Sequence, residues 1–261
     1  NTCPVNFEEP RILTRAGWQD YSVVDTRTTD VQLVAPGISL MEALGPLGLN
    51  SLTAYFGVTR IGQPQPGDVM VVSGAAGSTG SVAAQIGKIL GCRVVGIAGG
   101  SEKCDWLVNG LRLDAAIDYK CERVADRLAE LCPEGVDVFY DNVGGSIFTE
   151  VFGNLARFAR VVVCGQIAQY DRAGKAEASV DMLRLIYGAI TVRGFVMRDY
   201  ATEFDPARAQ IREWIATGRL QHREDIREGF DKLPESFLSL FDGSNQGTLL
   251  VVIDDDARSR S

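Results

Sequence analysis

Val69-Met-Val-Val-Ser-Gly-Ala-Ala-Gly-Ser-Thr-Gly80 places a short apolar run directly before a turn that contains three glycines. Such a run is typical of a β-strand that is buried on both faces. Ser81–Leu90 follows with Val82 and Ile86 at helical spacing, and Gly91 supplies a left-handed residue that ends the helix. The segment therefore predicts a strand, a glycine-rich turn and a helix, which form the first unit of a parallel sheet.

Strand-like and helical segments alternate from about residue 68 to residue 197. We expect strands to begin near residues 93, 115, 137, 160 and 191, with helices near residues 104–108, 124–131, 146–155 and 182–187. This alternation predicts an α/β fold, with a Rossmann doubly wound parallel sheet of six strands. A further helix is expected to have Asp205 as its N-cap, Pro206 as its first residue and Gly218 at its end.

Both ends of the chain carry strand-like pieces that have no core of their own. Gly17–Val24 and Val31–Val34 lie near the start, and a strand, a helix over Pro234–Phe241 and a strand over Thr248–Ile253 lie near the end. Two incomplete ends predict one shared second domain.

Composition narrows the class of protein. The 261 residues are 46% hydrophobic and 23% charged, with a net charge of -8, which is typical of an ordinary globular chain. An acidic chain without a Lys/Arg cluster argues against a nucleic-acid partner. No apolar run is long enough to span a membrane, no signal sequence is visible at the start, and the six cysteines form no C-x-x-C pair. We expect a cytoplasmic protein whose partner is a small molecule.

A metal site is not expected. His222 is the only histidine, and no cysteine lies at ligand spacing to it, so a clustered zinc site is not visible. We expect His222 to be a surface residue without a role.

The turn Gly74-Ala-Ala-Gly77-Ser-Thr-Gly80 carries the first functional signal. Glycines there let the backbone approach a pyrophosphate, which the N-terminus of the following helix faces. The motif is a variant, because Ala75 replaces the usual first glycine, and a plain tight turn is the alternative for the motif alone. The predicted dinucleotide-binding residues here are Gly77, Ser78, Thr79 and Gly80.

The end of the second strand favours NADPH as the dinucleotide. A NAD-binding domain normally places an Asp or Glu there, against the adenosine ribose. This chain has Ala98-Gly-Gly-Ser-Glu-Lys103, in which Ser101 and Lys103 stand where a 2′-phosphate needs a donor and a positive charge. Ser101 also fits an N-cap, and Lys103 opposes the helix dipole unless an anion is held there. The alternative for Lys103 is a solvated surface lysine, and Glu102 is expected to point to solvent.

Four stretches carry a specific resemblance: Ala75–Lys88, Gly91–Cys104, Asp141-Asn-Val-Gly-Gly145 and Val163–Tyr170. Together they resemble the zinc-independent medium-chain dehydrogenase/reductases of the prostaglandin reductase, leukotriene hydroxydehydrogenase and 2-alkenal reductase type, among whose relatives is bacterial curcumin reductase. The resemblance extends from about residue 17 to residue 252. It implies NADPH-dependent reduction of the carbon–carbon double bond of an α,β-unsaturated ketone or aldehyde, with hydride transfer to the β-carbon.

The resemblance also implies roles for residues. The turn from Gly77 to Gly80 would hold the pyrophosphate, and Lys103 and Tyr119 the 2′-phosphate. Tyr170 matches a tyrosine that steadies the enolate or relays the proton, although a loop tyrosine that only packs on the cofactor is an equal alternative. The residues expected around the ribose and nicotinamide are Asn142, Cys164, Gly165, Gln166, Ile167, Tyr170, Phe195, Val196, Met197 and Asn245. Nothing in the sequence would activate Cys164, so we expect it to pack rather than react.

The chain departs from this group in three places. Thr79 replaces a small apolar residue, Gly247-Thr248 replaces the usual Gly-Lys, and most of a barrel-like domain that begins relatives is not seen before Trp18. We therefore expect residues 1–45 to be the N-terminal remnant of a GroES-like, mainly-β substrate domain, 46–218 the NADP-binding Rossmann domain, 219–254 the return to the substrate domain, and 255–261 a tail.

Three functions stay open at this point. The first is an active reductase of an enone or enal. The second is a truncated NADPH-binding remnant without turnover, and the third is a quinone reductase of the same superfamily. Relatives are commonly dimers, so the resemblance implies a homodimer in which the strand near Thr191–Val196 pairs across a two-fold axis.

Overall fold

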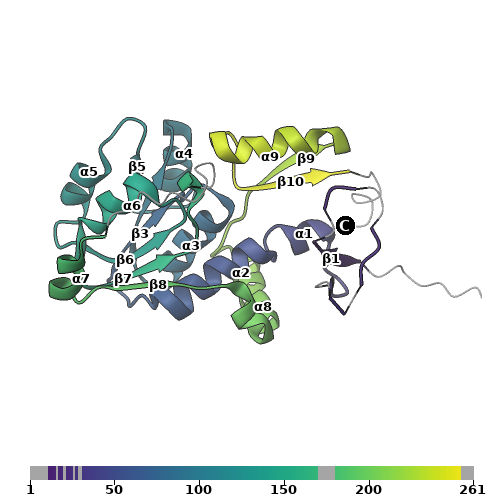
Figure 1. Ribbon diagram of the computed structural model, residues 1–261, viewed down its shortest axis with the longest axis horizontal. Helices are drawn as coiled ribbons and strands as arrows, with labels where there is room; N and C mark the ends of the chain where they lie inside the picture. Colours follow the sequence, from purple (N-terminus) through teal and green to yellow (C-terminus); the bar gives the residue numbers. More distant parts are fainter. Residues whose placement is uncertain are drawn as a thin grey trace, which may run out of the picture.

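A six-stranded parallel sheet forms the centre of the computed structural model, which describes residues 11–253 except 16, 20, 21, 26, 29, 30 and 170–179 (Figure 1). The strand order is β5-β4-β3-β6-β7-β8, and every pair is parallel. The expected doubly wound sheet is confirmed. Successive strands are added on one side of β3 up to β5 and on its other side from β6 onward, and ligands bind at such a switch point in the strand order. The strands are β3 (Val69–Ser73), β4 (Arg93–Ala98), β5 (Ala115–Asp118), β6 (Val136–Asp141), β7 (Leu155–Val163) and β8 (Thr191–Gly194).

Helices cover both faces of the sheet, because alternate strand residues bury opposite faces. Val72 packs into one apolar cluster and Val71 into the other. The first cluster includes residues of α2 (Leu49–Phe56), α3 (Ser78–Ile89) and α8 (Phe204–Ala216). The second is formed with α5 (Val124–Leu131), α6 (Gly145–Phe152) and Leu185 of α7 (Met182–Gly188).

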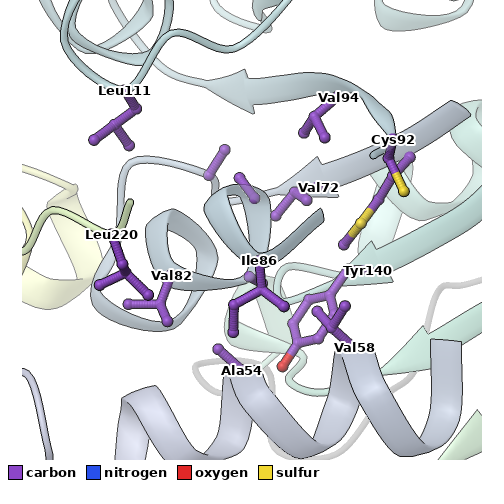
Figure 2. Packing of buried hydrophobic residues seen from close by; sticks show 14 of the residues in the cluster. Ala54, Val58, Val72, Val82, Ile86, Cys92, Val94, Leu111, Tyr140 and Leu220 are labelled. Atoms are coloured by element: carbon purple, nitrogen blue, oxygen red, sulfur yellow. The ribbon is translucent and has the colours of Figure 1, made fainter. Parts of the chain in front are cut away.

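α2 and α3 pack together against β6 in the first cluster. Figure 2 shows Val82 and Ile86 of α3 beside Ala54 of α2 and Tyr140 of β6. The Tyr140 ring is fully buried, and its hydroxyl donates to the carbonyl of Thr53 at 3.1 Å. A buried phenol needs such a partner, so this bond ties α2 to the centre of the sheet.

The segment before β3 is helical, which the sequence analysis did not anticipate. α2 runs directly into the π-helix η1 (Gly57–Gly62). A Cβ atom on Gly57 would lie 2.6 Å from the Tyr140 ring, so this glycine permits the close approach of helix and sheet.

Two helix starts differ from expectation. The N-cap of α8 is Glu203, not Asp205, because the 3-10 helix η4 (Met197–Glu203) continues straight into α8. Pro206 is tolerated there because the first turn has no N–H partners to lose. α4 (Ser101–Asp105) is capped by Gly100, which has φ 96°, so Ser101 is the first helical residue and not the cap. α4 then continues into the π-helix η2 (Trp106–Gly110).

The described segments nearest the two ends of the chain form small structures to one side of the main sheet (Figure 1). β1 (Ile12–Thr14) pairs antiparallel with β2 (Val31–Leu33), and α1 (Leu40–Leu44) follows. The strand expected over Gly17–Val24 is wrong for the residues described there, which lie in no strand. At the other end β9 (Glu224–Glu228) and β10 (Thr248–Val252) pair in parallel. Between them lie η5 (Phe230–Lys232) and α9 (Leu233–Asp242).

The division of the chain into domains stays a prediction. In the part of the chain that the structure describes, no helix combines the length and apolar character needed to cross a membrane.

Candidate functional site

The predicted site residues lie where the parallel strands end. Carboxyl ends of parallel strands share one edge of the sheet, so the segments that follow β3, β4, β6, β7 and β8 lie along that edge. These segments carry most of the residues predicted to bind a dinucleotide. The C-terminal segment before β10 approaches the same edge.

The glycine-rich turn is closely packed. Gly77 is the N-cap of α3, and Ser78 and Thr79 are its first two residues. A Cβ atom on Gly80 would lie 2.2 Å from the carbonyl oxygen of Gly74, so only glycine fits where α3 leaves the turn. A Cβ atom on Gly77 would meet only the carbonyl oxygen of Gly74, at 3.3 Å, so this position is less crowded than Gly80. This arrangement suits a turn that a phosphate group approaches.

The C-terminal segment lies against this turn. The amide of Gly247 donates to the carbonyl of Ala76 at 3.3 Å, and Gly247 forms an isolated parallel bridge with Gly77. Asn245 donates from Nδ2 to the carbonyl of Gly247 at 3.3 Å. The fold thus places Asn245 next to the glycine-rich turn, although the two are far apart in sequence.

Ser101, Lys103 and Tyr119 gather at the ends of β4 and β5. Lys103 donates from Nζ to the carbonyl of Gly243 at 2.6 Å. The Tyr119 ring packs over Gly99, where a Cβ atom would meet it at 2.9 Å. Ser101 is exposed in the first turn of α4. Glu102 is exposed as expected, but its Oε1 accepts a hydrogen bond from Gln246 Nε2 at 2.8 Å.

Sequence analysis missed two charged residues in this region. The guanidinium of Arg223 lies 5.5 Å from the centre of the Trp106 ring, and both line a small hollow with Lys103. Asp118 accepts hydrogen bonds from the backbone N–H groups of Gly100 at 2.8 Å and Lys120 at 3.0 Å. The bond from Gly100 is the main cause that lowers the pKa of Asp118. No local motif marks either residue, because only the fold brings them to the end of β4.

Asp141 organises the ends of β3, β6 and β7. Burial raises its pKa above the ordinary value, and hydrogen bonds that include one from Ser73 Oγ at 2.7 Å act in the opposite direction. Gln166 donates from Nε2 to the same carboxyl group at 3.0 Å. Asn142 donates from Nδ2 to the carbonyl of Ser73 at 2.7 Å, and the amide of Gly165 donates to that of Asp141 at 3.1 Å. Asn142, Gly165 and Gln166 are therefore brought together.

Cys164 lies beneath this region. Burial raises the pKa of its thiol to about 11, so the reactive thiolate is disfavoured near neutral pH. This direction supports the expectation that Cys164 packs.

The remaining predicted residues that the structure describes follow β7 and β8. Ile167 begins the 3-10 helix η3 (Ile167–Gln169). Phe195 packs against Gly57, and Val196 and Met197 follow it after β8. Tyr170, the predicted catalytic residue, lies outside the described residues.

The expected surface position of His222 was wrong. Its side chain is only 6% exposed, and its ring nitrogens contact Glu224 and Thr248. A single polar residue in a polar stretch favoured the surface, but the fold covers it with β10. Among the residues the structure describes, no group of three or more His, Cys, Asp or Glu side chains could hold a metal ion.

Comparison with known proteins identifies relatives over nearly the whole chain. A family model described as zinc-binding dehydrogenase matches residues 78–213. The putative NADP-dependent oxidoreductase YfmJ of Bacillus subtilis is 42% identical over 94% of this chain and 73% of its own length. The NADPH-dependent curcumin reductase of Escherichia coli is 34% identical over 94% of this chain and 72% of its own.

A solved structure shares the fold. The crystal structure of CurA from Vibrio vulnificus in complex with NADPH is 36% identical and superposes with a TM-score of 0.84, covering 92% of this chain and 72% of that protein. The sheet, the motifs along its carboxyl edge and these similarities lead to one assignment. The chain belongs to the medium-chain dehydrogenase/reductase superfamily of oxidoreductases, within the zinc-independent group that includes the curcumin and prostaglandin reductases.

Proposed function

We propose that this chain binds NADPH along the carboxyl edge of its sheet and reduces the carbon–carbon double bond of an α,β-unsaturated ketone or aldehyde. The cofactor assignment depends on one arrangement at the carboxyl edge of the sheet. Lys103 lies at the end of β4, and the glycine-rich turn that begins α3 lies at the end of β3. The two features suit the two phosphate positions of NADPH. The similarity to a curcumin reductase that is NADPH-dependent supports the same assignment.

The residues present fit the phosphate groups. A Cβ atom on Gly77 would meet only the carbonyl oxygen of Gly74 within 4 Å, and a Cβ atom on Gly100 would meet nothing within that distance. The turn from Gly77 to Gly80 would hold the pyrophosphate at the N-terminus of α3. Ser101, Lys103 and Tyr119 would hold the 2′-phosphate, with Arg223 as a further cation in reach of the same hollow.

The other end of the site would position the ring that reacts. Bound NADPH supplies the hydride, and zinc has no part in the proposal. We assign Tyr170 to hold or protonate the oxygen of the substrate carbonyl while hydride reaches the β-carbon. Residues that would surround the ribose and nicotinamide are Asn142, Cys164, Gly165, Gln166, Ile167, Tyr170, Phe195, Val196, Met197 and Asn245.

A titration followed by turnover tests this function. NADPH and NADH are titrated into the protein by fluorescence, and a simple enone is then added while NADPH oxidation is followed. We expect tighter binding of NADPH and oxidation that depends on the enone. A saturated ketone is the matched control, because it keeps the carbonyl but lacks the double bond.

Each result has a distinct meaning. Oxidation with the saturated ketone would contradict double-bond reduction, and oxidation with a quinone alone would favour a quinone reductase. Binding without any turnover would make the chain a cofactor-holding module. Equal affinity for NADPH and NADH would remove the assignment of Ser101, Lys103 and Tyr119.

We also propose that the chain forms a homodimer through β8. β8 lies at the edge of the sheet, all four of its residues are exposed, and it pairs only with β7 among the described strands. α7 next to it exposes Met182, Leu183, Ile186 and Tyr187. An open edge strand beside an apolar helix face is a typical pairing surface.

A further inference from the structure

A chain of polar side chains runs behind the glycine-rich turn. Ser78 Oγ lies 2.5 Å from Thr248 Oγ1, and Thr248 Oγ1 lies 3.3 Å from His222 Nε2. On its other side, His222 Nδ1 lies 2.7 Å from Glu224 Oε1. Asn50 of α2 donates from Nδ2 to Ser78 Oγ at 2.9 Å. The chain therefore leads from β9 to the first residue of α3.

The backbone beside His222 is held firmly to α3. The buried side chain of Gln85 accepts from the amide of Gln221 at 2.7 Å and donates to its carbonyl at 2.9 Å. This paired contact fixes the residue before His222 against the helix that begins at Ser78. The imidazole consequently has a defined place, which a loop histidine would lack.

The carboxylate of Glu224 determines which group donates and which accepts in this series of hydrogen bonds. A carboxylate can only accept, so Glu224 requires a hydrogen on His222 Nδ1. In the neutral imidazole Nε2 is then an acceptor, and Thr248 must donate to it. Ser78 in turn donates to Thr248. The hydroxyl hydrogen of Ser78 is thus directed away from the phosphate-binding turn.

Protonation of the imidazole reverses this order. Nε2–H then donates to Thr248, whose hydroxyl hydrogen turns to Ser78 Oγ. Ser78 already accepts from Asn50, so both its acceptor positions are filled and its own hydrogen is released toward another acceptor. At a helix N-terminus such an acceptor would be an anion, and a phosphate oxygen fits.

We infer that His222 acts through Thr248 as a positioning residue that sets whether Ser78 can donate a hydrogen bond to a phosphate of the bound dinucleotide. This inference rests on the proposed function, because it needs a dinucleotide at the glycine-rich turn. It predicts that NADPH binding and protonation of His222 favour each other.

Few other charges face the imidazole. α2, β10 and the first turn of α3 carry no Asp, Glu, Lys or Arg. On β9, Asp225 is paired with Arg227 at 3.4 Å, and Glu228 follows them. Arg223 lies over the Trp106 ring, and Glu42 of α1 is paired with Arg212. Glu224 is therefore the charged group in direct contact with the ring.

Nuclear magnetic resonance can show, before any ligand is added, which nitrogen of the neutral His222 ring carries the hydrogen. His222 is the only histidine in the chain, so the ¹⁵N signals of a histidine-labelled sample belong to it alone. We expect the neutral ring to carry its hydrogen on Nδ1. At a fixed pH, adding NADPH should increase the share of molecules whose ring carries both hydrogens, because coupling between two binding events is reciprocal. A neutral ring with its hydrogen on Nε2 would overturn the inference.

Binding measurements test whether Thr248 connects the protonation of His222 with the affinity for NADPH. NADPH is titrated into the unchanged protein, Thr248→Val and Thr248→Ser at several pH values. Valine keeps the shape of threonine but removes the hydroxyl group that connects His222 with Ser78, whereas serine keeps the hydroxyl. We expect the advantage of the unchanged protein over Thr248→Val to grow by about threefold to tenfold as His222 becomes protonated, which is the size of one net hydrogen bond. Thr248→Ser should behave as the unchanged protein does.

The ratio of the two affinities at each pH cancels the titration of the 2′-phosphate itself. A ratio that stays constant with pH would show that Thr248 is only structural and would overturn the inference. Absence of NADPH binding to the unchanged protein at every pH would instead reject the proposed function. The coupling of His222 to a dinucleotide would fall with it.

Discussion

The ammonium group of Lys103 donates a hydrogen bond to the carbonyl oxygen of Gly243, 2.6 Å away. Gly243 has φ 70° and ends α9, so this bond connects the segment after β4 with the C-terminal segment that covers the glycine-rich turn. A lysine in the first turn of a helix is unfavourable in the field of the helix dipole. The contact with a carbonyl oxygen helps to hold the positive charge where a 2′-phosphate is expected.

Lys103→Ala should therefore weaken NADPH binding far more than NADH binding. Loss of one charge-assisted hydrogen bond corresponds to about 1.5–3 kcal/mol, or roughly tenfold to a hundredfold in affinity. Fluorescence titration with both dinucleotides measures the difference. Lys88→Ala is the matched control, because Lys88 forms an ion pair with Asp114 on the far part of α3. Equal losses for NADPH and NADH would contradict a phosphate contact.

Gly80→Ala should disturb the fold itself. Its Cβ atom would lie 2.2 Å from the carbonyl oxygen of Gly74, and backbone cannot move aside as a flexible side chain can. We expect a loss of about 3 kcal/mol or more in the free energy of unfolding, at the upper end for overpacked sites. Gly77→Ala, with its nearest contact at 3.3 Å, should keep most of the stability but bind NADPH less tightly. Thermal unfolding and titration of both variants separate the two effects, and similar unfolding temperatures would count against the packing argument.

The sheet could be predicted because its signal is local. Each buried strand is a short apolar run, as in β3, and each crossover helix has its own periodicity, so the positions of the strands and crossover helices followed from the sequence. α2 and η1 precede the alternating strands and helices and were not predicted. The hydrogen bond from Tyr140 to the carbonyl of Thr53 joins β6 to α2 across the fold, so no local pattern in the sequence could indicate it.

The site residues also fall into two groups: those marked by a local sequence motif and those that only the fold brings to the site. The glycine turn and the segment after β4 are contiguous motifs, so Gly77 and Lys103 could be predicted from sequence. Arg223 and His222 reach the same region only because β9 and β10 fold back over α3. Thr248 was noticed as a departure from the family pattern, but its contact with Ser78 could not be inferred without the fold.

Tyr170→Phe should distinguish a proton-donor role from packing on the cofactor. If the hydroxyl group assists the reaction, kcat should fall by about a hundredfold, the lower range for a general acid, with NADPH affinity unchanged. Steady-state kinetics with an enone and a separate NADPH titration provide both values. A weaker affinity for NADPH with an unchanged kcat would instead assign the ring to packing.

Val192→Lys should convert the proposed dimer into a monomer. Val192 lies on the open edge strand β8, and lysine on an edge strand discourages pairing. Sedimentation velocity measures the change in mass. Leu238→Lys is the control, because Leu238 is an exposed apolar residue of α9, away from β8. A monomer already in the unchanged protein, or a dimer that both variants retain, would contradict an interface at this edge.

Stability should decline at alkaline pH, and Cys164 should account for part of the decline. Burial raises the pKa of its thiol from the ordinary value of 9.0 to about 11. The unfolded chain therefore releases this proton near pH 9, whereas the folded chain keeps it until about pH 11. Below pH 9 the full contribution is present, and it is lost as the pH rises through this window, by about 2–3 kcal/mol for a shift of this size. Urea unfolding of the unchanged protein and of Cys164→Ala, each compared with its own value at neutral pH under reducing conditions, measures the loss. The variant should show a shallower decline, because it has no proton to lose at that position, and parallel curves would mean that the buried thiol does not couple to folding.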